Sequence, residues 1–286
     1  MALSIFTSGA AMSSTNALNK SNSILSTAME RLGTGKRINS AADDAAGLQI
    51  ATRLQGQVNG MSVAQRNISD ATAMLQTGEG AFEEVTNILY RMKDLATQAA
   101  NDTNNASDRS AMTAEFTALT TELGNIWTNT DFAGAKLFSS TTEGLGKTGG
   151  LSFQIGSASG EKLDTTTITT SITTLSGQLA PKGSVSGFKL DSSTTARASI
   201  SGLQGVINSV ASARSNMGAL INRLGHTAAN LSNMQDNTTL ALGNIRDADF
   251  ASEATNMTRN QMLAQTSMSM LKQANSMSGM VMSLLG

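Results

Sequence analysis

Apolar side chains recur every seven residues over a long stretch in the first half of the chain. Two interleaved series make up the pattern, namely Ile68, Leu75, Phe82, Leu89 and Ala96, and Ala71, Gly78, Val85, Met92 and Ala99. Interleaved series of this kind, sustained for over four repeats, are typical of a coiled-coil seam. The pattern therefore predicts a long helix, at about residues 44–100, that buries one face against a partner.

The same rhythm returns later in the chain and predicts a second long helix at about residues 200–243. Its apolar positions are Leu203, Val210, Met217, Leu224 and Leu231. A shorter helix at about 109–127 is predicted from Met112, Phe116, Leu119, Leu123 and Ile126. Only the turn-like residues 101–105 separate it from the first helix, so the two should pack antiparallel.

Residues 131 to about 199 differ in composition, being rich in Gly, Ser and Thr and containing Pro181, the one proline. Short alternating runs at 151–155, 166–170 and 187–190 predict β-hairpins there. The expected fold is mainly α. It is a long antiparallel coiled-coil helical rod, residues 44–246, with a small β-hairpin-containing segment in the middle of the chain.

The apolar helical pattern continues into both terminal segments, residues 1–43 and 247–286. Their candidate contact residues are Leu3, Ile5, Phe6, Leu18, Leu25, Met29 and Leu32, and Phe250, Met257, Leu263, Met268, Leu271, Leu284 and Leu285. Burying about ten such side chains contributes on the order of 15 to 25 kcal/mol at most. Immobilising a subunit costs roughly 4 to 15 kcal/mol. We therefore expect identical chains to join head to tail into a helical filament, and the two segments to meet only in that polymer.

The composition of the chain makes some classes of binding partner unlikely. The chain has 20 basic and 21 acidic residues, which nearly cancel, so no basic field would attract nucleic acid. It has no cysteine, no continuous apolar run long enough to span a membrane and no signal-peptide pattern at its start. We expect no membrane insertion, and if the protein leaves the cell, we expect a route that does not use a classical signal peptide.

No constellation of catalytic residues emerges. Residues 144–149 match G-x-G-x-x-G, but no helix pattern follows, so a loop is predicted. The single histidine, His226, is expected on a helix surface, and the acidic pairs Asp43–Asp44 and Asp247–Asp249 are expected to cap helices. We predict no enzyme activity, no metal and no cofactor.

Residues 30–47 read Glu-Arg-Leu-Gly-Thr-Gly-Lys-Arg-Ile-Asn-Ser-Ala-Ala-Asp-Asp-Ala-Ala-Gly, which closely resembles the N-terminal signature of bacterial flagellin. Further similar segments are residues 65–71, 76–81, 151–156, 213–223, 230–233, 245–251 and 281–285. Together they cover residues 1 to about 138 and 200 to 286. Only about 60 residues separate the matching halves, so the resemblance implies a short form whose outer variable domains are reduced or absent.

The resemblance implies a structural subunit that self-assembles into the extracellular flagellar filament for swimming motility. Residues 1–43 and 247–286 would form the inner tube of that filament, and residues 44–246 the outer tube. It also implies unfolded export through the flagellar type III apparatus. The implied partners are many copies of the chain itself, a flagellar export chaperone, the filament cap and hook-junction proteins.

The family is also recognised by the innate receptor TLR5 of a host. The positions that match the recognised segment are Arg91, Leu95 and Gln98, with Glu115 on the next helix. The plainer interpretation is that these residues form the rod surface and contact neighbouring subunits.

Two other functions stay open from the sequence. One is a hook–filament junction protein, which is built from similar terminal helices. The other is a secreted coiled-coil protein that binds a host or chaperone helix. Continuous self-polymerisation into long filaments would separate the filament subunit from both.

Overall fold

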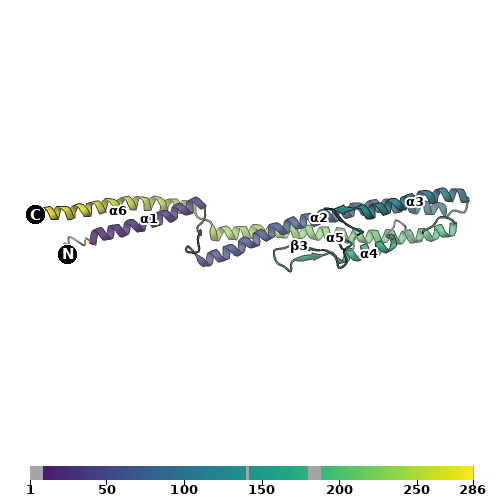
Figure 1. Cartoon of the computed structure of the whole chain (residues 1–286), viewed down its shortest axis with the longest axis horizontal. Helices are drawn as coiled ribbons and strands as arrows, with labels where there is room; N and C mark the ends of the chain where they lie inside the picture. Colours follow the sequence, from purple (N-terminus) through teal and green to yellow (C-terminus); the bar gives the residue numbers. More distant parts are fainter. Residues whose placement is uncertain (1–8, 140–141, 180–187, 286) are drawn as a thin grey trace. The chain divides into compact units, whose positions relative to one another are not determined.

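The computed structural model describes residues 9–139, 142–179 and 188–285 (Figure 1). The helices are α1 (Gly9–Thr34), α2 (Ala45–Ala99), α3 (Ala106–Asn129), α4 (Thr166–Leu179), α5 (Ser193–Arg246) and α6 (Phe250–Leu285). The strands are β1 (Asp131–Phe132), β2 (Ala135–Lys136), β3 (Ser152–Gln154) and β4 (Lys162–Asp164). The mainly α fold with small hairpins in mid-chain is confirmed.

Two compact units make up the chain. A terminal unit combines Met1–Val58 with Asp236–Gly286, and a rod unit comprises Asn59–Gln235. The helix breaks lie elsewhere, between α1 and α2 and between α5 and α6. The predicted division into residues 1–43 with 247–286 and residues 44–246 follows those breaks and stays a prediction.

In the rod unit, α2 and α5 run antiparallel. Lys93 Nζ donates to Gln204 Oε1 at 2.6 Å, and Glu79 pairs with Arg214 at 2.8 Å, so positions fall along α2 as they rise along α5. All ten seam positions predicted between residues 68 and 99 are buried. The heptad prediction is confirmed here because the two helices cover each other's apolar stripe.

Helix α3 folds back along α2, as predicted. Asn105 begins α3 with a capping box, in which its side chain and that of Asp108 each accept from the other's backbone N–H. Across the two helices, Arg109 Nε donates to the carbonyl of Ala99 at 3.0 Å. Figure 1 shows α3 beside the later part of α2. These bonds satisfy backbone groups that a helix end leaves open.

An aromatic cluster marks the other end of α3. Trp127 stacks on Phe138 with ring centroids 5.2 Å apart, and Phe138 lies 4.7 Å from Phe82 of α2. All three rings are buried. The chain after α3 is thereby held against the rod.

The glycine loop at 144–149 is structural. Leu145 is fully buried, and its carbonyl accepts from Thr169 Oγ1 at 3.2 Å. Gly144 has φ +66°, and a Cβ there would lie 2.2 Å from the carbonyl oxygen of Lys136, so only glycine fits. The side chain of Leu145 packs closely against Gly78 of α2, because glycine has no side chain and leaves room for the leucine.

The β predictions were partly wrong. Residues 152–154 form a strand, and its partner is β4, with Phe153 opposite Leu163. Residues 166–170, predicted as a strand, begin helix α4. The reason is that Ile168, Ile172 and Leu175 repeat at helical spacing and are buried together. Residues 188–190 form neither helix nor strand, and position 187 lies outside the described residues.

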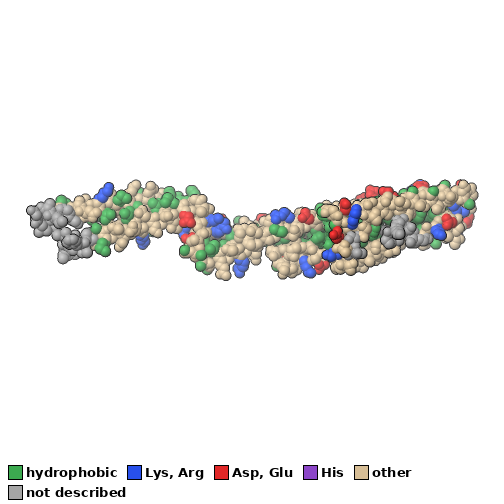
Figure 2. All heavy atoms as spheres, in the orientation of Figure 1, with side chains coloured by type: hydrophobic (Ala, Val, Ile, Leu, Met, Phe, Trp, Pro, Cys, Tyr) green, Lys and Arg blue, Asp and Glu red, His purple; other side chains and the backbone are tan. Residues whose placement is uncertain are grey.

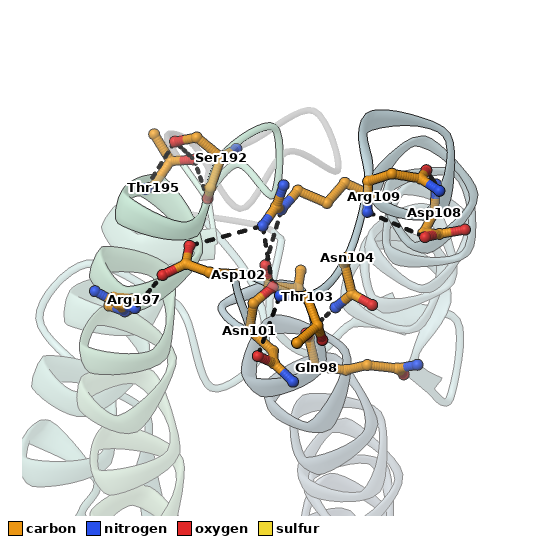
Figure 3. Close-up of polar contacts among 12 residues, drawn as sticks. Gln98, Asn101, Asp102, Thr103, Asn104, Asp108, Arg109, Ser192, Thr195 and Arg197 are labelled. Atoms are coloured by element: carbon orange, nitrogen blue, oxygen red, sulfur yellow. Dashed lines mark hydrogen bonds and ion pairs between the residues drawn. The ribbon is translucent and has the colours of Figure 1, made fainter.

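At the tip of the rod unit, the α2–α3 turn is tied to the start of α5 (Figure 3). Asp102 pairs with Arg197 at 3.3 Å and with Arg109 at 4.0 Å. The Ser193 hydroxyl and these two guanidinium groups lower the pKa of the Asp102 carboxyl. One carboxylate in the α2–α3 turn therefore links α3 to the start of α5, which is distant in sequence.

In the terminal unit, α1 and α6 lie side by side (Figure 1). The C-terminal end of α1 is beside the start of α6, where Arg31 pairs with Glu253 at 3.0 Å. Backbone bonds from Arg37 N to Arg246 O and from Ala248 N to Gly35 O join the two connecting segments. The expectation that the terminal segments meet only in the polymer was wrong, because these bonds bring α1 and α6 together within one chain.

The acidic pairs act mainly as caps. Asp44 Oδ1 accepts from Gly47 N at 2.8 Å and begins α2. Asp249 Oδ1 accepts from Ala251 N at 3.0 Å and begins α6. Asp43 Oδ2 instead accepts from Asn39 N and Ser40 N in the preceding turn, and these bonds lower the pKa of its carboxyl. The capping interpretation is confirmed for Asp44 and Asp249.

Candidate self-assembly surface

The inner seam of α1 alternates large and small residues at spacings of three and four. Leu18, Leu25 and Leu32 are half-buried, while Ser21 and Ala28 between them are buried. The three leucines were predicted as polymer-core contacts. Within one chain, these leucines lie on the side of α1 that faces α6.

The facing seam of α6 has the same rhythm. Met257 and Leu271 are half-buried, and the smaller Asn260 and Ala264 are buried. Asn260 donates its Nδ2–H to the carbonyl of Asn256 at 2.8 Å, which satisfies the buried amide. Small residues at the contact let two helices approach closely, but they bury little apolar area.

Many large apolar side chains of α1 and α6 are exposed (Figure 2). Among the predicted contacts, Met29, Phe250, Leu263 and Met268 are 52%, 69%, 48% and 49% exposed. Six more side chains on α1 and α6 are exposed, namely Met12, Ile24, Met262, Met270, Met277 and Met280. Sequence reasoning did not single out Ile24, Met262, Met270 or Met280. Leu3, Ile5 and Phe6 lie outside the described residues, and so do the side chains of Leu284 and Leu285.

Four of the exposed residues lie on one broad face of α6, which we call the outer stripe: Met262, Leu263, Met270 and Met277. The last three are seven residues apart, so they lie within about 20° of one another per repeat around the helix, while Met262 lies about 100° from its neighbour Leu263. The residues that face α1, such as Asn260 and Ala264, occupy a different face of the same helix. This seven-residue spacing is the signal by which sequence analysis could have found Met270.

The energy of covering these side chains is large. Full burial of one large apolar side chain contributes about 1.5 to 3 kcal/mol. Ten of them on α1 and α6 are more than a third exposed, which gives on the order of 15 to 30 kcal/mol as an upper bound. That range exceeds the roughly 4 to 15 kcal/mol needed to immobilise a partner. The surface therefore favours association.

The signature segment at 30–47 holds the corner of the terminal unit. Arg31 lies 3.0 Å from Glu253 and 4.0 Å from Asp43, and all three side chains are largely covered. Arg37 donates through a terminal nitrogen to the carbonyl of Ile245 at 2.8 Å. Gly35, with φ +70°, turns the chain. These signature residues position α1 against α6.

Of the four residues predicted to contact the receptor, three are exposed and one is buried. Arg91 of α2 and Glu115 of α3 form an exposed ion pair at 2.7 Å, and Gln98 is exposed. Leu95 is only 2% exposed and belongs to the seam between helices. Its side chain is therefore not available for a direct contact, unlike the other three.

The described residues hold no group of three or more His, Cys, Asp or Glu side chains that could bind a metal. His226 is exposed on α5 as predicted and lines a groove of about 620 Å³ with Ile68 and Ile221. Among the helices that the structure describes, none has both the length and the apolar content needed to cross a membrane.

Two regions of the chain match one protein family. Residues 5–143 match the bacterial flagellin N-terminal helical region, and residues 200–285 match the bacterial flagellin C-terminal helical region. The chain belongs to the bacterial flagellin family. This flagellin is therefore a structural protein, a self-polymerising subunit of the extracellular flagellar filament.

Flagellins of other bacteria are similar to this chain over most or all of its length. This flagellin is 37% identical to a flagellin of Halalkalibacterium halodurans over 90% of each chain. It is 34% identical to flagellin A of Vibrio anguillarum over the whole of both chains. These full-length matches favour the filament subunit over the hook–filament junction protein and over the secreted binding protein.

Two solved structures are similar to this flagellin. Bacillus cereus flagellin is 34% identical over 58% of this chain and 88% of that chain, with a TM-score of 0.46. A putative flagellar hook-associated protein from Vibrio parahaemolyticus is 19% identical over 72% of this chain and 100% of that chain, with a TM-score of 0.55. The second likeness concerns the fold alone.

Proposed function

We propose that this flagellin polymerises through the outer stripe and the neighbouring exposed apolar side chains of α1 and α6. The observation that carries the proposal is the arrangement of the terminal unit. The residues that α1 and α6 bury between them are small, whereas ten large apolar side chains on these two helices are more than a third exposed. In the polymer, copies of the same surface cover one another. Residues 1–43 and 247–286 form the inner tube of the filament, and residues 44–246 form the outer tube.

A double variant, Leu263→Gln with Met270→Gln, tests this assignment. We expect it to fold with unchanged helix content and to elongate filament seeds at least about tenfold more slowly, because two polar amides replace apolar contacts. The matched control is Leu263→Met with Met270→Leu, which keeps both positions apolar and should elongate normally. Normal elongation by the glutamine variant would exclude the outer stripe as the assembly surface.

The same exposed side chains support the other partners that we propose. Before assembly they need a cover, and a flagellar export chaperone that binds α6 would supply one. The filament cap and the hook-junction proteins would meet the terminal unit at the two ends of the polymer. A pull-down of the chaperone with the wild-type subunit and with the Leu263→Gln, Met270→Gln variant tests the chaperone contact. Equal capture of the chaperone by both proteins would contradict this contact.

We also propose that Arg91, Gln98 and Glu115 form the surface that TLR5 binds, and that the protein has no catalytic activity. The three exposed polar side chains on α2 and α3 support the receptor contact. Arg91→Ala and Glu115→Ala should each weaken binding in a direct assay, while the exposed Arg66→Ala on α2 serves as a control. Unchanged binding in both variants would exclude this surface.

A further inference from the structure

Methionine is distributed unequally over the molecule. On α1 and α6, seven methionines are 49% to 61% exposed, namely Met12, Met29, Met262, Met268, Met270, Met277 and Met280. Of the six methionines of the rod unit, Met61, Met92, Met112 and Met217 are at most 8% exposed, Met74 is half-buried and Met234 is 47% exposed. The accessible thioethers thus include three of the four outer-stripe residues.

We propose that the outer-stripe methionines Met262, Met270 and Met277 are an oxidation site that blocks assembly of the free subunit until it is repaired. The oxidant is a peroxide. The inference rests on the proposed function, because it needs the outer stripe to be buried in the polymer. It adds a chemical modification that acts on that surface.

The reaction is a two-electron oxygen transfer. The thioether sulfur attacks one oxygen of hydrogen peroxide, the O–O bond breaks and an S–O bond forms. The second oxygen leaves with both bonding electrons, takes a proton and becomes water. The product is methionine sulfoxide. In repair by a methionine sulfoxide reductase, two thiols become a disulfide, and the sulfoxide oxygen leaves as water.

Exposure makes the reaction selective. A peroxide reaches a sulfur atom that is half exposed, whereas a fully packed side chain such as Met92 or Met217 reacts only after the rod unit opens. Helices α1 and α6 bury mostly small residues between them, so their large thioethers stay accessible while the pair is intact. Assembly would then cover the same sulfur atoms and protect them.

Oxidation changes what the outer stripe can do. A sulfoxide is polar and chiral, and its oxygen needs a hydrogen-bond partner. A buried position between apolar helices offers none, so each sulfoxide there weakens subunit addition by about tenfold. Three outer-stripe methionines on one helix therefore make elongation strongly dependent on their redox state.

The first experiment identifies which methionines are oxidised. Free subunit and preformed filaments are treated with hydrogen peroxide, and peptides are examined by mass spectrometry. We expect Met262, Met270 and Met277 to gain an oxygen atom in the free subunit and to be protected in the filament. Met61, Met92 and Met217 should stay unmodified in both. Equal oxidation of these buried rod-unit methionines and of the three α6 methionines would overturn the proposal.

The second experiment links the modification to assembly. Peroxide-treated wild-type subunit should lose elongation on seeds and regain it after treatment with sulfoxide reductases. A variant with Met262→Leu, Met270→Leu and Met277→Leu keeps the stripe apolar, so it should elongate before and after peroxide. Loss of elongation in the treated variant equal to that of wild type would exclude these methionines.

The two proposals fail separately. If the untreated Leu263→Gln, Met270→Gln variant elongates normally, the assembly surface is wrong. If that variant fails to elongate but peroxide leaves the wild-type subunit fully active, the assembly surface stands and the oxidation site is overturned.

Discussion

The rod unit and the terminal unit use the same heptad rhythm with opposite results. In the rod unit, Leu75, Phe82 and Leu89 are fully buried by other helices of the chain. In the terminal unit, the residues buried between α1 and α6 are small, and large side chains such as Phe250 and Met270 are 69% and 58% exposed. The rod unit completes its core by itself, whereas the terminal unit needs further copies.

The difference shows why apolar periodicity alone does not identify an interface. A two-helix pair can cover one stripe on each helix, and any second stripe stays in water. The rod unit has more elements to offer, since α3, α4 and the β3–β4 hairpin add further surfaces. In the terminal unit, α1 and α6 pair with each other, so a second stripe on α6 stays exposed, and we propose that further copies cover it.

Phe82→Ala should have the largest effect on this contrast. Phe82 is fully buried and its ring lies 4.7 Å from that of Phe138, so truncation should cost about 3 to 5 kcal/mol of unfolding free energy. Denaturant unfolding measures the loss. Phe250→Ala, at a ring that is 69% exposed, is the control and should change stability little. Similar losses in both variants would remove the distinction between the units.

Ala28→Leu should have an intermediate effect, confined to the terminal unit. Ala28 is 2% exposed in the inner seam, and extra bulk there should separate α1 from α6 at a cost of about 1 to 3 kcal/mol. Hydrogen exchange should show faster exchange in α1 and α6 and unchanged protection of residues 82–99. Met29→Leu, at the neighbouring exposed position, should leave exchange unaltered. Unchanged protection of α1 in Ala28→Leu would contradict the proposed pairing.

Asp102→Asn should have a smaller effect that depends on pH. The folded-state pKa of Asp102 is lowered, so its carboxylate stabilises the rod unit above its ordinary pKa of about 3.8, and this contribution is lost as the pH falls through the folded pKa. The difference in melting temperature between wild type and variant should be largest near neutral pH and shrink below about pH 3.8. A difference that is constant down to pH 2 would show that the carboxylate charge plays no part.

Arg91→Ala should have the smallest effect. Its ion pair with Glu115 has side chains that are 55% and 45% exposed, and such pairs contribute about 0 to 1 kcal/mol. Denaturant unfolding should therefore be nearly unchanged, which makes this variant suitable for the receptor assay. A loss comparable to that of Phe82→Ala would mean that the pair anchors the rod unit.

Much of the fold could be predicted because the periodicity was long. More than four repeats along α2 named ten of the eleven buried positions between residues 68 and 99, all except Leu95, and turn residues located α3. Residues 166–170 were misread because five alternating residues fit a strand as well as a helix. Only the continuation to Ile172 and Leu175 favours the helix, since the apolar spacing becomes four and three.

The sequence by itself determined the helices, their heptad registers, the absence of cysteine chemistry and the resemblance to flagellin. All of these depend on residue order along one helix. The tertiary structure decided which apolar residues face inward. Leu25 and Leu271 lie in the seam between α1 and α6, whereas Leu263 and Met270 face outward. Several stripes on one helix look alike in sequence, and only the position of the partner helix removes one of them from water.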